Sequence, residues 1–420
     1  MKLSFYIFFF LVVNNITYAQ KNDAITWIDS NAITLESNNS EKYVNSSSDY
    51  LNSFFSKAEI YGFGEATHYN KEFFEAKTAF FKYLVLHQNV RVFIIEESFG
   101  ACYSINEYIK GNNSKNLKGL VQNFRQSIWE TEEMLELIQW MKTYNETKPL
   151  NQQICFYGND CQFNYELISI LKNQLIKNNI KLNQEEIDLL EIYAANFNDY
   201  FNKDKSGKIY TKLDDLKLIL SKLRENTTID EESKLTIDAL NYFAEFLNKQ
   251  TQEVRDFYMA KSVENIYNFT KKKLFIWAHN DHINKNVVHA TQTPSMGNLL
   301  YKKFKNKYYA MGFEFGVGEL LSFNTEKNVS ENIILDKPIK NTNSDFLFST
   351  NHTAFFIDFE TASKDESMKK FLSQKRNSIM IGGQGLVLKY LKYNYIHEKY
   401  IDIFDGLIYI KKISRSIPLK

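Results

Sequence analysis

A histidine and a glutamate lie close together after an apolar run near the start of the chain. Glu65 and His68 follow the run Ala58–Phe63, and Gly64 opens the turn because glycine permits backbone conformations that other residues avoid. A glutamate at this distance can hydrogen-bond one imidazole nitrogen and leave the other to act as a base. Histidine is the side chain best suited to proton transfer near neutral pH. The spacing predicts an oriented histidine base, with a charged surface turn as the alternative.

A second carboxylate follows another apolar run. Glu96 comes directly after Val90–Ile95, at the expected buried end of a strand. A carboxylate in such a place is costly unless a cation or hydrogen-bond donors pair with it. Glu96 is therefore a candidate site residue, and a structural salt bridge is the alternative. Glu97 has the opposite strand parity and is expected to face away.

Two more histidines follow a third apolar run, Lys273–Ala278. His279 and His282 lie too close to this run's end to suit a core, and Asn280 adds an amide between them. The histidines could stabilise an oxyanion, protonate a leaving alcohol or bind a metal ion.

Residue types alone leave a metal centre open. His68, His279 and His282, with glutamates, could form a catalytic zinc site with one open position, but an oriented histidine can equally activate water without metal. The sequence has no G-x-S-x-G elbow and no P-loop, which disfavours an α/β-hydrolase and phosphoryl transfer. The other four histidines are expected at the surface or in packing: His87, His289, His352 and His397.

The elements that must position these residues alternate between strands and helices. Apolar runs predict strands at Ala58–Phe63, Val90–Ile95, Gln153–Tyr157, Lys273–Ala278, Tyr308–Phe315, Thr353–Phe359, Ile379–Gly382 and Gly406–Lys411. Helical spacing of apolar residues predicts helices at Lys71–His87 and about Phe163–Lys177. This alternation is typical of an α/β fold with a central, largely parallel sheet flanked by helices. Because ligands bind beyond the carboxyl ends of such strands, we expect the candidate residues to converge on one rim.

Residues 163–270 differ from the rest of the chain, because helical periodicity dominates and proline is absent. We expect a mainly α-helical insertion between strands, acting as a cap or lid, or else a plain helical hairpin packed on the sheet. The domain expectation is a signal peptide at residues 1–19 and one catalytic domain at residues 20–420 that contains this insertion.

The N-terminus has the three parts of a secretory signal. Lys2 precedes the apolar stretch Leu3–Val13, and Thr17-Tyr18-Ala19 offers a cleavage site. We expect an exported, periplasmic or secreted protein cleaved near Ala19, whereas an uncleaved anchor is disfavoured because about 20 apolar residues are needed to span a bilayer. The net charge of +1 gives no electrostatic case for nucleic acid. We expect a monomer with no membrane contact after cleavage.

The chain has three cysteines, Cys102, Cys155 and Cys161, so at least one thiol is left without an intramolecular disulfide partner. Cys155 and Cys161 could form a short bridge, but a buried free thiol is favoured for Cys155 because unpaired cysteine is commonly buried.

Five motifs in chain order resemble the erythromycin esterase family. The first is Gly62-Phe63-Gly64-Glu65-Ala66-Thr67-His68 with Lys71 to Lys77, and the second is Phe93-Ile94-Ile95-Glu96 with Phe99-Gly100. The third combines Trp129, Glu132, Trp140-Met141 and Tyr144-Asn145 with Phe156-Tyr157-Gly158, and the fourth is Trp277-Ala278-His279-Asn280 with His282 and Met296-Gly297. Phe404 to Ile408 is similar to the closing strand of the family. Together the motifs cover nearly the whole chain after the signal.

The resemblance implies hydrolysis of a macrolide lactone, and hence antibiotic resistance, without a metal or other cofactor. It implies that His68 is the general base on water, that Glu65 and Glu96 orient it and organise the site, and that His279 and His282 position the substrate or stabilise the oxyanion. The substrate-binding residues expected on this basis are Lys77, Asn280 and Trp129.

Lys77 departs from the family pattern, which often has an arginine at the matching position; the charge is kept but the bidentate fork is lost. Two alternatives to the macrolide assignment stay open. One is an exported esterase for a different small-molecule ester, and the other is a periplasmic module that binds metal or haem on the same fold.

Overall fold

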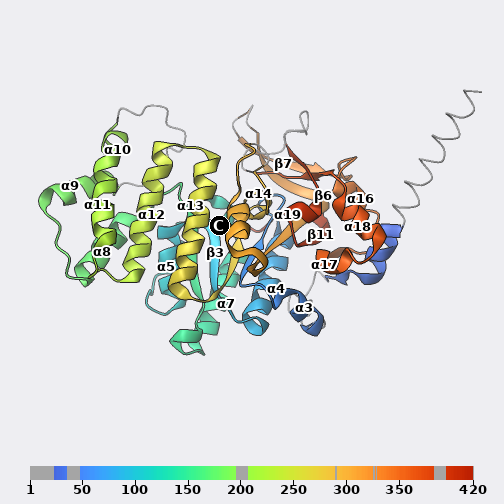
Figure 1. The fold of residues 1–420 in the computed structure, drawn as a ribbon, viewed down its shortest axis with the longest axis horizontal. Helices are drawn as coiled ribbons and strands as arrows, with labels where there is room; N and C mark the ends of the chain where they lie inside the picture. The colour runs from blue at the N-terminus through green and yellow to red at the C-terminus, as the bar shows by residue number, and fades with distance from the viewer. Residues whose placement is uncertain are drawn as a thin grey trace, which may run out of the picture. The chain divides into compact units, whose positions relative to one another are not determined.

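The computed structural model describes residues 23–35, 48–194, 207–288, 291–324, 327, 329–382 and 394–419. The expected signal peptide at residues 1–19 and His289 lie outside these residues. The chain forms two compact units (Figure 1). Of the described residues, those within 56–63, 80–309 and 416–420 form the larger unit, and those within 1–55, 64–79 and 310–415 form the smaller unit.

The larger unit is built on parallel strands in the order β2 (Ile60–Phe63), β5 (Lys273–Trp277), β3 (Val90–Ser98) and β4 (Cys155–Asp160). These are the first four strands predicted from apolar runs. Parallel strands covered on both faces read as continuous apolar sequence, which is why the runs identified them. Phe93 at the centre stacks on Phe156 and Phe275, with ring centroids 5.0 and 5.6 Å apart.

Two of these strands extend further than expected. β3 runs on past Ile95 through Glu96 and Glu97, and it pairs Ser98 with Asp160 after an irregularity in the register. The polar residues at these two strand ends therefore lie within the sheet rather than in loops. Their side chains are buried, so each must have polar partners there.

Helices fill the remainder of the larger unit. After β3 come α5 (Phe99–Ile109), α6 (Leu117–Val121) and α7 (Glu132–Glu146). Between β4 and β5 lie α8 (Leu167–Lys177), α9 (Gln184–Ile192), α10 (Lys208–Thr211), α11 (Leu213–Glu225), α12 (Glu231–Asn248) and α13 (Gln252–Thr270). After β5 follow α14 (Asn280–Ile283) and α15 (Met296–Phe304). The predicted helical character of residues 163–270 is confirmed for the described parts, 163–194 and 207–270, in which α11, α12 and α13 pack side by side (Figure 1). A lid function stays a prediction.

The smaller unit has mixed strand directions. Its strands run β1 (Ile33–Thr34), β8 (Ala354–Asp358), β11 (Gly406–Ile413) and β6 (Tyr308–Asn324), with β7 (Val329–Leu335) on β6. β11 and β6 are parallel, whereas β8 is antiparallel to both β1 and β11, and β7 is antiparallel to β6. A separate pair joins β9 (Arg376–Ile379) and β10 (Tyr395–Glu398). Its helices include α3 (Ser48–Phe55), α16 (Asn343–Leu347), α17 (Phe359–Ala362), α18 (Glu366–Ser373) and α19 (Tyr400–Ile403).

Helix α4 (Lys71–His87) begins in the smaller unit and has the bounds expected from its apolar spacing. The predicted α/β class, with mostly parallel strands flanked by helices, is confirmed. β1, β7 and β10 were not predicted: β1 has only two residues, and polar residues interrupt β7 and β10. The strand expected at Ile379–Gly382 shares only Ile379 with β9.

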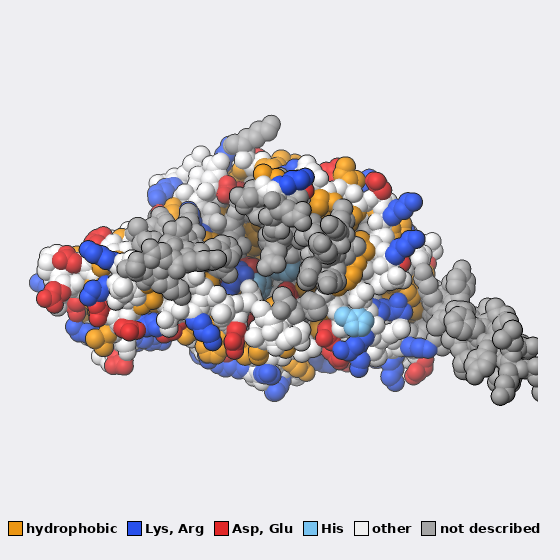
Figure 2. Space-filling model, turned by 90° about the horizontal axis from the view of Figure 1, so that it is seen from above, with side chains coloured by type: hydrophobic (Ala, Val, Ile, Leu, Met, Phe, Trp, Pro, Cys, Tyr) orange, Lys and Arg blue, Asp and Glu red, His pale blue; other side chains and the backbone are white. Residues whose placement is uncertain are grey.

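Cys102, Cys155 and Cys161 are all free thiols, with Cys102 and Cys161 buried and Cys155 partly exposed. The alternative of a Cys155–Cys161 bridge is therefore not observed. Acidic and basic side chains are interspersed on the face shown in Figure 2, in keeping with the near-zero net charge. Among the helices that the structure describes, none is both long and apolar enough to cross a membrane.

Candidate active site

The predicted Glu65–His68 pair forms in the smaller unit, in the turn that leads into α4. Nδ1 of His68 lies 2.5 Å from Oε1 of Glu65. The left-handed residue of this turn is Tyr69, with φ of 62°, rather than Gly64. Left-handed backbone at a residue with a side chain is strained, and such strain tends to occur at functional sites. The turn that brings His68 next to Glu65 therefore has a strained backbone at Tyr69, which costs folding free energy.

Lys77, two turns into α4, contacts the other oxygen of the same carboxylate. Its Nζ lies 2.5 Å from Oε2 of Glu65 and 5.4 Å from the ring centroid of Phe313. Lys77 and Glu65 are almost completely buried, whereas the His68 side chain is 14 % exposed. Burial alone would raise the pKa of Glu65, but Lys77 and His68 outweigh it and lower that pKa to about 2. Glu65 is therefore a fixed carboxylate that Lys77 contacts, and the expected substrate contact of Lys77 stays a prediction.

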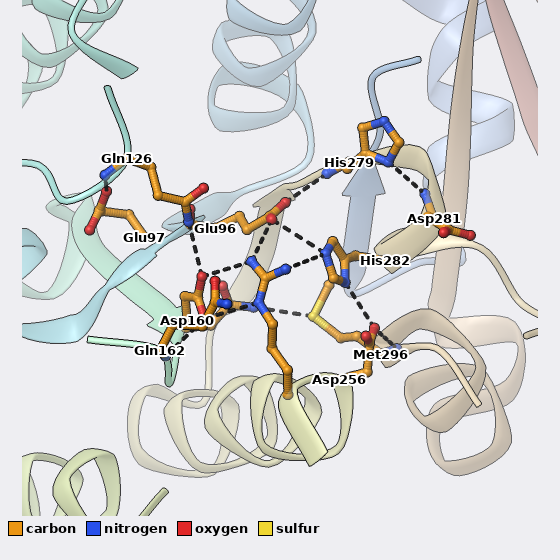
Figure 3. A network of polar contacts seen from close by, with 12 residues as sticks. Glu96, Glu97, Gln126, Asp160, Gln162, Asp256, His279, Asp281, His282 and Met296 are labelled. Atoms are coloured by element: carbon orange, nitrogen blue, oxygen red, sulfur yellow. Dashed lines mark hydrogen bonds and ion pairs between the residues drawn. The ribbon is translucent and has the colours of Figure 1, made fainter. Parts of the chain in front are cut away.

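The second group of predicted residues lies in the larger unit, around Glu96 on β3 (Figure 3). One carboxylate oxygen of Glu96 accepts a hydrogen bond from the backbone N–H of His279 at 2.9 Å. The other lies 3.3 Å from Nε2 of His282. The structure thus brings Glu96, His279 and His282 together, as the parallel order of β5 and β3 requires.

His279 and His282 have different surroundings although they share one motif. His279 caps α14, and its Nδ1 accepts a hydrogen bond from the backbone N–H of Asp281 at 3.3 Å. Nδ1 of His282 faces Oδ1 of Asp256 at 2.9 Å. Asn280, between them, is buried at the first position of α14.

Arg255 and Asp256 on α13 complete this cluster and were not predicted. Nη2 of Arg255 donates to Glu96 and to Asp160 at 2.7 Å each, and Nε donates to Asp160 at 3.2 Å. Asp160 is the last residue of β4, so one guanidinium joins the carboxylates of two neighbouring strands. Arg255 is 8 % exposed and Asp256 is fully buried. A planar guanidinium suits such forked pairing with carboxylates.

Glu97 is also buried, and its side chain points away from that of Glu96 (Figure 3), as the opposite strand parity predicts. Its carboxylate accepts backbone hydrogen bonds from Ser98 at 2.6 Å and from Gln126 at 2.8 Å. Burial raises the pKa of Glu97 to about 8, although these N–H groups act in the opposite direction. Glu97 thereby ties the end of β3 to the loop before Trp129.

Trp129 contacts the backbone of the candidate site residue Glu96. It is completely buried, and its indole N–H donates to the backbone oxygen of Glu96 at 3.0 Å. The side chain of Gln126 donates to the same oxygen at 2.7 Å and to Asp160 at 2.9 Å. Trp129 therefore holds the Glu96 backbone, and the substrate contact expected of it stays a prediction.

Comparisons with known proteins agree with these motifs. The family model described as erythromycin esterase matches residues 85–413. This chain belongs to the erythromycin esterase family. It is also 24 % identical to the protein named "Putative hydrolase YbfO" of Bacillus subtilis (strain 168), over 94 % of this chain and 92 % of that protein. Membership of the family and this relative indicate a hydrolase.

Solved structures share the fold. A succinoglycan biosynthesis protein superposes with a TM-score of 0.78 at 22 % identity, covering 95 % of this chain and 99 % of its own. A protein from Bacillus cereus gives a TM-score of 0.78 at 20 % identity with the same coverage. A mutant of erythromycin esterase EreC in its open conformation gives a TM-score of 0.60 at 15 % identity, covering 88 % of this chain and 94 % of its own.

The five residues expected to be catalytic thus fall into two clusters. Glu65 and His68 lie in the smaller unit, whereas Glu96, His279 and His282 lie in the larger. Within the ranges that the structure describes, no set of three or more His, Cys, Asp and Glu side chains is arranged to hold a metal ion.

Proposed function

We propose that this member of the erythromycin esterase family is an exported esterase that hydrolyses the lactone of macrolide antibiotics, with His68 as the general base. The observation that carries the proposal is the contact between Nδ1 of His68 and the carboxylate of Glu65. Since Glu65 is an ionised acceptor, it keeps the His68 proton on Nδ1 and makes Nε2 the atom that takes a proton from water.

The proposed reaction adds one water to the ester. Nε2 of His68 removes a proton from water as its oxygen attacks the carbonyl carbon, and the resulting tetrahedral oxyanion collapses with cleavage of the C–O bond. The proton then passes from His68 to the leaving alkoxide, giving an alcohol and a carboxylic acid, which ionises to the carboxylate by releasing its proton to solvent. General-base assistance contributes about 10²–10⁴-fold to such a step, and an oxyanion donor contributes a further 10²–10³-fold or so. The resemblance assigns oxyanion stabilisation and substrate positioning to His279 and His282, and site organisation to Glu96.

Lys77 enters this scheme through Glu65. Its buried ammonium group keeps the carboxylate ionised and fixed in place, so that Glu65 cannot take the His68 proton for itself. The family's more frequent arginine would make the same charge contact with a second donor. The presence of lysine instead of arginine at position 77 therefore affects how Glu65 is held rather than a direct contact with the substrate.

Mass spectrometry of erythromycin incubated with the mature protein tests the substrate. We expect a product heavier by one water, with and without EDTA. Loss of product in EDTA would refute the metal-independent mechanism and favour a catalytic metal centre. If erythromycin is unchanged but a panel of other esters is cleaved, the substrate is a different ester and the macrolide assignment is wrong.

The variant His68→Ala tests the base. We expect turnover to fall by at least about 10²-fold because the general base is lost. His397→Ala is the matched control, since His397 is an exposed histidine of the same unit and pairs with Asn377. Circular dichroism of both variants checks the fold. Retention of appreciable activity by folded His68→Ala would exclude His68 as the base.

Export is tested separately on the full chain. The signal pattern predicts that protein recovered from the periplasm or medium begins at Gln20. An intact N-terminus in the membrane fraction would instead indicate an uncleaved anchor.

A further inference from the structure

Lysine side chains are concentrated in three segments of the larger unit, at the amino ends of two of its parallel strands. The segments are residues 57–59 before β2, residues 264–273 from the end of α13 to the start of β5, and residues 301–307 at the end of α15. Together they contain eight lysines and only two glutamates. Six of the lysines are exposed: Lys57, Lys271, Lys302, Lys303, Lys305 and Lys307.

Backbone hydrogen bonds and a ring contact join the three segments. The backbone N–H of Glu59 donates to the carbonyl of Lys307 at 2.8 Å, and that of Leu274 donates to the carbonyl of Glu59 at 2.8 Å. The ring of Tyr267 on α13 meets that of Phe304 on α15 edge to face, with centroids 5.2 Å apart. The segments therefore form one surface, which we call the lysine surface (residues 57–59, 264–273 and 301–307).

The two glutamates of the lysine surface neutralise only part of its charge. Glu59 lies 3.0 Å from Nζ of Lys307, and Glu264 lies 2.7 Å from Nζ of Lys303. Lys261, just outside the surface, also contacts Glu264 at 3.1 Å. The surface keeps six excess positive charges, whereas the whole chain has a net charge of +1, so the other residues together carry −5. Positive charge is thus segregated on this part of the molecule.

Two exposed aromatic side chains lie within the lysine surface. Phe269 on α13 is 39 % exposed and Tyr301 on α15 is 40 % exposed. Aromatic rings are favoured at the boundary between the apolar and polar parts of a bilayer. Lysine carries a compact, hydrated charge without the fork that binds one phosphate in a fixed geometry. The combination suits a broad anionic surface with apolar material beneath it better than a single small ligand.

The lysine surface is at the opposite strand ends from the second cluster of candidate site residues. Lys273 is the first residue of β5, and His279 follows the other end of the same strand. A five-residue strand spans about 17 Å at about 3.3 Å per residue. A partner bound at the lysine surface therefore leaves the carboxyl ends of the strands uncovered.

We propose that the lysine surface binds the anionic headgroups of a phospholipid bilayer. The negative potential of such a bilayer attracts basic groups, and each lysine close to it strengthens binding by about fivefold. Phe269 and Tyr301 then lie at the level of the headgroups. The proposal does not depend on the proposed function, and it departs from the expectation that the mature chain makes no membrane contact.

Co-sedimentation of the mature protein with vesicles tests the partner. Vesicles that mix phosphatidylglycerol with phosphatidylcholine should bind the protein at about 0.1 M NaCl, where the Debye length is about 10 Å, and release it at about 1 M, where this length is about 3 Å. Vesicles of phosphatidylcholine alone should not bind it. Absence of binding to the anionic vesicles at the lower salt would overturn the proposal. Binding to alginate, an acidic polysaccharide, but not to the anionic vesicles would also overturn it and would make the partner an acidic polymer.

The triple variant Lys271→Gln/Lys302→Gln/Lys305→Gln tests the location. It removes three exposed charges of the lysine surface, so the affinity for anionic vesicles should fall by about 10²-fold. The matched control removes the same charge from exposed positions elsewhere in the larger unit and should bind like the wild type: Lys115→Gln/Lys181→Gln/Lys249→Gln. Circular dichroism checks that both variants are folded. Equal affinities of the two triple variants would show that net charge, and not the lysine surface, governs binding.

Discussion

Removal of the Lys77 ammonium group should strongly destabilise the protein, because it leaves the buried Glu65 carboxylate without its cation. Lys77→Met keeps the length and apolar stem of the side chain. Lys77 and His68 together outweigh burial and bring the pKa of Glu65 to about 2 instead of 4.5, a net stabilisation of the carboxylate of about 3 kcal/mol at about 1.4 kcal/mol per pKa unit; Lys77 is the larger of the two favourable partners. Loss of one partner from a buried ion pair typically costs about 3–5 kcal/mol, which agrees with this value. We therefore expect the free energy of unfolding in urea at pH 7 to drop by about 3 kcal/mol.

The pH dependence distinguishes an electrostatic effect from a packing defect. Because the folded-state pKa of Glu65 is lowered, its contribution is fully present above about pH 4.5 and is lost as the pH falls towards 2. The difference between wild type and Lys77→Met should narrow over that range. The double variant Glu65→Gln/Lys77→Met should regain most of the loss, since it removes both charges.

Lys71→Met is the matched control on the same helix. Lys71 is 41 % exposed and lies 3.7 Å from Glu75, so its removal should change the unfolding free energy by at most about 0.5 kcal/mol. A Lys77→Met variant that is as stable as this control at pH 7 would refute the reasoning. A loss that stays constant down to pH 2 would show that packing, and not charge, is responsible.

Further predictions concern other buried groups. Burial raises the pKa of Glu314 to about 7 despite a hydrogen bond from Tyr400. The unfolded chain therefore loses this proton at a lower pH than the folded protein, and the free energy of unfolding should fall as the pH rises from about 4.5 to 7. Glu314→Gln should remove this fall in urea unfolding, and an unchanged dependence of the unfolding free energy on pH would contradict the prediction. Arg255→Lys should lower kcat or the free energy of unfolding although it keeps the charge, because lysine cannot reproduce the two parallel hydrogen bonds from Arg255 to Asp160. If kcat and unfolding free energy both equal those of the wild type, this two-bond contact is dispensable. Alkylation of the unreduced, denatured protein should modify all three thiols, those of Cys102, Cys155 and Cys161. An unmodified pair of cysteines found by mass spectrometry would instead reveal a disulfide.

Local sequence patterns identified the parallel strands of the larger unit, three strands of the smaller unit (β6, β8 and β11) and helix α4. The apolar spacing of Lys71–His87 gives the bounds of α4, because a helix with one buried face repeats its pattern every turn. Apolar runs located β2 and β5, because parallel strands covered on both faces are apolar at nearly every position. The errors fall where polar residues continue a strand, as Glu96 does in β3, since pairing with a neighbouring strand has no signature in the local sequence.

The candidate site was predictable where its partners are close in sequence or, like Glu96 and His279, follow neighbouring parallel strands. Glu65 and His68 are three residues apart, so their contact follows from the spacing alone. Arg255 is 159 residues from Glu96 and 95 from Asp160, and no local pattern links them. The sequence of α13 did give one indication of buried charges. Apolar residues lie around most of the helix circumference, so its charged side chains could not all face solvent.

Even a correctly identified motif does not reveal the state of its histidines. Nδ1 of His279 accepts a hydrogen bond from the backbone N–H of Asp281, so that nitrogen carries no proton. Nδ1 of His282 faces the carboxylate of Asp256 and must carry one. Two histidines separated by two residues thus have opposite proton positions, and the difference comes from α13, which lies outside their motif. The roles of such residues in a distant relative therefore have to be assigned from the charges that surround each ring, because the spacing of the motif is the same whichever proton each ring carries.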